Sequence, residues 1–127
     1  MKREVLFDGT EIVPGYARAV KVGNHVCISG TTSLDKDGNV VGRDAYAQTK
    51  EITRKFDAIL AKAGARRSHI VRLTLYCTDP AHAEGVVKAM SEDYAEINPA
   101  SALIGTPWLA RPGLLIEIEA DALIADD

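Results

Sequence analysis

The segment 114–121, with the sequence LLIEIEAD, alternates apolar and acidic side chains with a period of two. Such alternation is typical of a β-strand with one face in a core. Ile116 and Ile118 point to one face of this strand. Glu117 and Glu119 point to the other, where they either lie in water on the outside of an antiparallel sheet or face a cleft in which a carboxylate handles a proton. Under both interpretations the chain must build a sheet around this strand.

The other elements follow from periodicity and from turn residues. Gly23-Asn24 predicts a tight hairpin turn. Asp44 is a suitable N-cap for the first helix, and Gly64 a suitable residue to end it. The sequence predicts strands at 1–7, 16–22, 25–30, 71–78, 101–106 and 114–123, and helices at 44–63 and 79–97.

This order, β-β-β-α-β-α-β-β, predicts one α+β domain over residues 1–127. Each helix carries one apolar stripe, so both helices should lie on the same face of a mixed six-stranded sheet. The charged side of the first helix, which includes Lys55, is expected to be solvated. The second face of the sheet mixes polar residues such as Arg72 and Tyr76 with apolar ones, which indicates a subunit interface with wet clefts and hence an oligomer.

Composition excludes several classes of protein. The net charge of −3 argues against a protein that grips nucleic acid. The sequence lacks a signal-peptide h-region and any apolar run of membrane-spanning length, so a cytoplasmic protein is expected.

Cys27 and Cys77 lie in apolar segments and are expected to be buried free thiols. His25, His69 and His82 fall on different predicted elements, so no metal site is predicted.

Three stretches resemble the Rid superfamily, the RidA or YjgF-type proteins: VKVGNHVCISG at 20–30, NPA at 98–100 and IEIEA at 116–120. The resemblance implies a chorismate-mutase-like fold and a homotrimer with small-molecule clefts between adjacent subunits. It also implies that neither a metal nor an organic cofactor is used. The best-studied members hydrolyse reactive enamines and imines, such as 2-aminoacrylate, to 2-keto acids and ammonia.

By position, the resemblance implies that Tyr16, Ser29, Gly30 and Glu117 line the cleft. Glu117 would orient or activate the water that attacks the imine carbon. Backbone groups near Ser29 and Gly30 would help to hold the ligand.

The chain departs from the deaminase pattern where the fifth strand begins. Those enzymes have an Arg that clamps the substrate carboxylate at the position of Ser101, and RidA often has Cys where Leu103 stands. A charged hydrogen bond is worth roughly 1.5–3 kcal/mol, so its loss weakens binding about 10- to 150-fold. Either Arg111 or Arg18 replaces the missing group, or the chain belongs to an Arg-lacking branch that binds a more neutral or apolar molecule. Trp108 is either an interface anchor or part of such a site.

Three functions are therefore open on the sequence. The first is hydrolysis of an imine- or enamine-like metabolite with Glu117 as the acid/base, and the second is non-catalytic binding of a metabolite in the same cleft. The third, RNA cleavage, is the weakest, because the chain is acidic and has neither a histidine pair nor a basic and aromatic groove.

Overall fold

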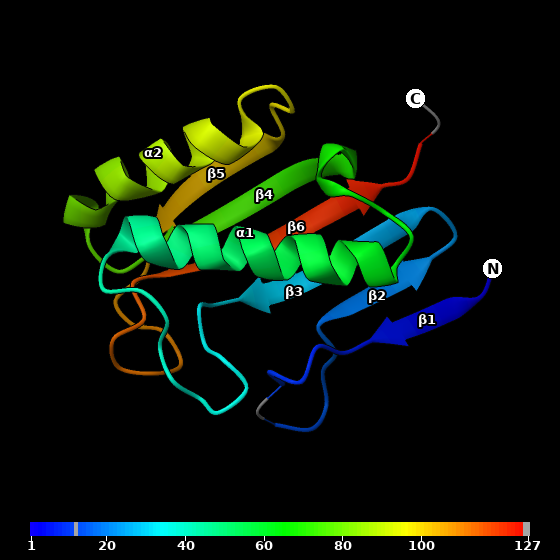
Figure 1. Cartoon of the computed structure of the whole chain (residues 1–127), viewed down its shortest axis with the longest axis horizontal. Helices are drawn as coiled ribbons and strands as arrows, with labels where there is room; N and C mark the ends of the chain where they lie inside the picture. The colour runs from blue at the N-terminus through cyan, green and yellow to red at the C-terminus, as the bar shows by residue number, and fades with distance from the viewer. Residues whose placement is uncertain (12, 126–127) are drawn as a thin grey trace.

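A computed structural model describes residues 1–11 and 13–125 of the chain and shows an α+β fold in two layers (Figure 1). One mixed sheet of six strands has the order β1-β2-β3-β6-β4-β5, and α1 and α2 both cover one of its faces. The predicted chorismate-mutase-like architecture is therefore confirmed. The elements are β1 (Arg3–Leu6), β2 (Ala19–Val22), β3 (His25–Thr31), α1 (Ala45–Lys62), β4 (Ile70–Cys77), α2 (Ala83–Tyr94), β5 (Ala100–Gly105) and β6 (Ile116–Leu123), with short 3-10 helices η1 (Arg67–His69) and η2 (Pro80–His82).

The acidic alternating strand, β6, lies inside the sheet. It pairs antiparallel with both β3 and β4. Ile116 and Ile118 are 0% and 1% exposed beneath the helices. The alternation therefore carries Glu117 and Glu119 onto the face of the sheet that no helix covers.

Helix α1 packs against the sheet through its apolar stripe. Ile52, Phe56 and Ile59 are fully buried, and each such side chain stabilises the fold by about 1.5–3 kcal/mol. The predicted caps are confirmed, since the Asp44 carboxylate accepts a hydrogen bond from the backbone N–H of Ala47 and Gly64 has a φ of +76°.

The second predicted helix is divided and shorter than expected. Residues 80–82 form η2, and α2 ends at Tyr94 instead of continuing to residue 97. This crossover returns the chain so that β5 pairs parallel with β4, as a helical connection allows. Among the described residues, no helix combines the length and apolar character that a membrane crossing needs.

Two expectations about individual side chains were wrong. Lys55 is not solvated: it is 5% exposed, and its Nζ donates hydrogen bonds to the backbone oxygens of Thr32 and Leu34. Cys27 is exposed, although Cys77 is buried as expected. The neighbours of Cys27 in β3 point into the core, so the period of the strand turns the thiol outward.

Candidate functional site

The loops that follow β1 and β3 and the loop between β5 and β6 gather at one end of the sheet (Figure 1). Between them and the uncovered face of the sheet lies a cleft of about 550 Å³. Four of the residues that the sequence nominated for a site meet there: Tyr16, Ser29, Gly30 and Glu117. The further lining residues include Thr10, Val13, Arg18, Thr32, Leu34, Lys55, Ala110 and Glu119.

Glu117 projects from β6 across the backbone of Gly30 in the neighbouring strand β3. A Cβ atom at position 30 would collide with Oε2 of Glu117, so the carboxylate occupies space that only glycine leaves open. Burial raises the pKa of Glu117; the charge of Arg18 lowers it in part, and that of Glu119 raises it further. A carboxyl group with a raised pKa holds and delivers a proton more readily than an ordinary surface carboxyl group.

A second carboxylate, Glu119, lies two residues along the same strand. It accepts a hydrogen bond of 3.1 Å from the hydroxyl of Tyr76. A smaller hollow of about 310 Å³ is lined by Gly30, Tyr76, Glu117 and Glu119 as well as by residues of the β5–β6 loop. It shares three residues with the larger cavity, so the two hollows adjoin each other.

Arg18 is the arginine that reaches this cleft. It is 4% exposed, and its Nη1 donates hydrogen bonds of 3.0 and 3.2 Å to the Gly30 oxygen and Thr31 Oγ1. Its Nε lies 3.5 Å from Asp8 and 3.7 Å from Glu11. Much of the guanidinium group is therefore already paired with two carboxylates and with the strand backbone.

In the turn that contains Asp8, hydrogen bonds and the charge of Arg18 favour the ionised form of the Asp8 carboxyl group. Burial would raise the pKa of Asp8, yet hydrogen bonds from the Thr10 hydroxyl and backbone, together with the charge of Arg18, lower it to about 2. Asp8 is thus ionised beside Arg18 at any physiological pH. One hydrogen bond of Arg18 goes to the backbone oxygen of Gly30, over which Glu117 lies.

Lys55 is a cleft residue that the sequence prediction missed. Burial, followed by the charge of Arg18, lowers its pKa to about 8. Its spacing offered a signal, because Ile52, Lys55, Phe56 and Ile59 occupy positions i, i+3, i+4 and i+7 of one helical face. Only the carbonyl groups of the 32–34 segment, which come from elsewhere in the chain, explain why a lysine is tolerated there.

The charges around the cleft do not favour an anionic ligand. Arg18 and Lys55 supply two cationic side chains, whereas Glu117 and Glu119 line the same cavity and Asp8 stands beside Arg18. The described lining residues of the two hollows include no histidine or cysteine. Carboxylates are therefore the only strong metal ligands among these side chains.

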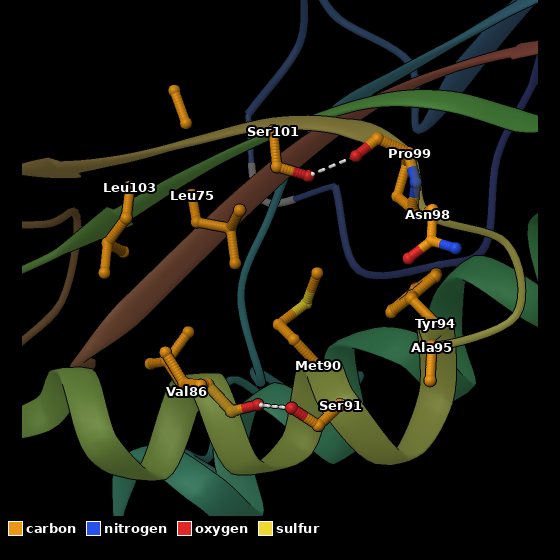
Figure 2. Close-up of a pocket in the computed structure, with 12 residues that line it drawn as sticks. Leu75, Val86, Met90, Ser91, Tyr94, Ala95, Asn98, Pro99, Ser101 and Leu103 are labelled. Carbon is orange, nitrogen blue, oxygen red and sulfur yellow. Dashed lines mark hydrogen bonds between the residues drawn. The ribbon is translucent and has the colours of Figure 1, made fainter.

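Ser101 and Leu103 lie in a different pocket. Both point from β5 toward α2, across a largely apolar cavity of about 480 Å³ that Met90 and Val86 also line (Figure 2). The hydroxyl of Ser101 donates a hydrogen bond to the Pro99 oxygen. Within one chain, these two residues therefore do not share a cavity with Glu117.

The register of the sheet explains this separation. Leu103 is aligned with the buried Leu75 of β4, whereas Glu117 is aligned with Tyr76 on the opposite face. Arg111, the other arginine considered as a replacement, lies beside Gly38 and is not among the residues that line the cleft.

Fold and cleft together define an α+β domain with a carboxylate-lined cleft on an uncovered sheet face, and known proteins share this fold. The family model described as "Endoribonuclease L-PSP" matches residues 10–124. The chain belongs to this family, the YjgF/RidA family.

Relatives with similar sequences and structures cover nearly the whole chain. A RutC family protein of Pyrococcus abyssi is 34% identical over 96% of this chain and 98% of its own. The structure of Rv2704 from Mycobacterium tuberculosis, titled as a member of the YjgF/YER057c/UK114 family, has a TM-score of 0.87 at 34% identity, with 97% of this chain and 100% of that chain covered. A structure from Thermotoga maritima titled as a putative endoribonuclease has a TM-score of 0.89 at 26% identity, with 99% and 100% covered.

Proposed function

We propose that this chain binds a small imine- or enamine-type metabolite in clefts between subunits and hydrolyses it, with Glu117 as the catalytic acid/base. The observation that carries the proposal is the position of Glu117: a half-buried carboxylate with a raised pKa, lying over Gly30 in a polar cleft. Nothing in the fold itself requires a carboxylate there, and its burial costs stability. A group of this kind is characteristic of a functional site.

The chemistry needs one group that gives and takes protons. An enamine first takes a proton at carbon and loses one from nitrogen, which makes it an imine. Protonated Glu117 gives its proton to the imine nitrogen and then accepts one from the attacking water, so that a C–O bond forms and a carbinolamine results. Glu117 next protonates the amine and recovers a proton from the hydroxyl group as the C–N bond breaks. The products are a carbonyl compound and ammonia, and a positioned acid/base contributes about 10²- to 10⁴-fold to such a step.

A second copy of the chain completes the site in this proposal. Every residue of β5, an edge strand, is exposed, and Leu103 and Ile104 are 43% and 41% exposed. Trp108 in the following loop is 72% exposed. Apolar edges of this kind are normally covered, and a neighbouring copy would bring its Ser101 and Leu103 toward Glu117. We propose the homotrimer that the family resemblance implies, in a cytoplasmic protein.

The proposed ligand needs no cofactor, and the cleft favours a neutral or cationic ligand, so an anionic substrate such as 2-aminoacrylate should bind only weakly. Ser101 stands where the deaminases have their carboxylate-clamping arginine, and Arg18 is already paired with Asp8 and Glu11. The cleft therefore lacks an uncommitted guanidinium group for a bidentate contact. Glu117 and Glu119 instead suit a protonated iminium nitrogen, and they repel a phosphate backbone, which makes RNA a poor ligand.

The second candidate is a binding protein without catalysis. The substitution at Ser101 favours it, because loss of the clamp removes the group that orients an imino acid for attack. The two functions share the cleft and differ in whether Glu117 transfers protons.

One assay separates them. 2-Aminoacrylate is generated enzymatically, and the release of pyruvate and ammonia is followed with wild type, Glu117→Ala and the control Glu84→Ala, which removes an exposed carboxylate on α2. We expect wild type and the control to accelerate release with a high KM, and Glu117→Ala to match buffer. Wild type indistinguishable from buffer would overturn hydrolysis. Quenching of Trp108 fluorescence by pyruvate in that case would support the binding protein.

A further inference from the structure

A cluster of three metal-ligating side chains lies on the uncovered sheet face, away from the Glu117 cleft. His25 and Cys27 are two residues apart in β3, and Val26 between them is fully buried. The strand period therefore places the imidazole and the thiol side by side on the outer face. Cys27 is directly opposite Asp121 of β6, which adds a carboxylate to the pair.

The three ligand atoms converge on one point. Nε2 of His25 lies 3.1 Å from Oδ1 of Asp121 and 3.5 Å from Sγ of Cys27, and all three atoms lie within 4.8 Å of one another. Zinc bonds of about 2.0–2.1 Å to nitrogen or oxygen and 2.3 Å to sulfur, at tetrahedral angles, put ligand atoms about 3.3–3.6 Å apart. The two measured edges match this spacing to within a few tenths of an ångström.

A catalytic thiol–imidazole–carboxylate relay does not fit the same atoms. In a relay the carboxylate holds one ring nitrogen while the other faces the nucleophile, but here the thiol and the carboxylate both approach Nε2. A plain His25–Asp121 surface ion pair would account for two of the residues but leaves the thiol without a role.

We propose that His25, Cys27 and Asp121 bind a divalent zinc-type cation through three protein ligands and leave a fourth position open. A thiolate and a carboxylate together neutralise its two charges, and a mixed nitrogen, sulfur and oxygen set suits zinc better than magnesium or calcium. In the single chain the side chains of His25 and Asp121 are 48% and 37% exposed, which leaves room for a fourth ligand.

This site is separate from the proposed hydrolase site. Asp121 and Glu117 are four residues apart on β6, a distance of about 13 Å along an extended strand. The cation would tie β3 to β6 at this end of the sheet. The proposal does not depend on what the Glu117 cleft does.

Equilibrium dialysis of the full chain against Zn²⁺, followed by elemental analysis, tests the proposal. We expect one zinc per wild-type chain, and an affinity at least about tenfold lower for Cys27→Ser and for His25→Ala, since even the loss of an outer-shell partner has an effect of that size. The control His82→Ala, which removes a histidine outside the cluster, should bind zinc like wild type. Circular dichroism should show all three variants folded, because the changed side chains lie at or near the surface.

Substitution of Co²⁺ gives a second readout that reports directly on sulfur. The wild-type complex should show a thiolate-to-cobalt charge-transfer band that Cys27→Ser lacks. Absence of stoichiometric zinc binding, equal affinity of wild type and both cluster variants, or a cobalt complex without the thiolate band would each overturn the proposal.

Discussion

Replacement of Gly30 by alanine is expected to remove the chemistry of the cleft while leaving the fold intact. The new methyl group would collide with Oε2 of Glu117, the far end of a flexible side chain. The carboxylate has to swing away by about 1 Å, a displacement that can lower a rate about 100-fold. The backbone of β3 tolerates the change, because Gly30 is not among the described residues with positive φ.

The cost to stability should be small. Alanine in a strand gains about 0.5–1 kcal/mol over glycine through backbone entropy, which offsets part of the cost of moving Glu117. A net change of at most about 1 kcal/mol corresponds to a melting-temperature shift of about 4 °C for a domain of this size. Gly105→Ala is the matched control, since it adds a methyl group in open space on β5.

The 2-aminoacrylate assay and a thermal melt should be run on Gly30→Ala, Gly105→Ala and Glu117→Ala. If the methyl group acts by displacing the carboxylate, Gly30→Ala loses activity and Gly105→Ala keeps it. Wild-type activity in Gly30→Ala, or an equal loss in Gly105→Ala, would refute this reasoning.

Three further predictions concern neighbouring residues. Ser101→Arg should lower the KM for 2-aminoacrylate about 10- to 150-fold, because it restores a charged hydrogen bond; an unchanged KM in steady-state kinetics would show that Ser101 of a neighbouring copy does not reach the cleft. Arg18→Gln should lower the free energy of unfolding in urea by about 3–5 kcal/mol, because it leaves Asp8 and Glu11 uncompensated; a loss under 1 kcal/mol would argue against the network. Glu117→Gln should have a higher melting temperature than wild type at neutral pH. Because the pKa of Glu117 is raised in the folded state, the ionised carboxylate of wild type destabilises that state. That advantage should disappear as the pH falls below about 4.3, and melts that differ equally at both pH values would contradict the burial of this carboxyl group.

Local patterns predicted most of the fold. The alternation in β6 and the apolar stripe of α1 are set by one buried face each, and the capping residues Asp44 and Gly64 act within a few residues of their own position. Patterns of this kind depend on neighbours in the sequence, so they can be seen without coordinates.

The candidate site depends on contacts between distant segments, and the sequence predicted less of it. The resemblance brought Tyr16, Ser29, Gly30 and Glu117 into one cleft, but their catalytic and binding roles stay a prediction. Lys55 could not be assigned, because its burial depends on backbone oxygens more than 20 residues away in the chain.

Two further features of the structure depend on which residues of neighbouring strands are paired. The sequence alone did not predict these pairings. The separation of Leu103 from Glu117 depends on how β5 and β6 align with β4. The cluster of His25, Cys27 and Asp121 likewise needs the β3–β6 register, and it was missed because the histidines were compared only with one another.

The central claim is that Glu117 is a buried carboxyl group that acts as an acid/base. The most direct test of this claim is the titration of Glu117 itself. Carbon-13 NMR of glutamate-labelled protein, with Glu117→Gln used to assign the signal, gives the pKa of Glu117 without any substrate. A midpoint clearly above the ordinary value of about 4.3 is predicted. A midpoint at or below that value would mean that the cleft does not favour the protonated form of Glu117, and the proposed acid/base role would then be wrong.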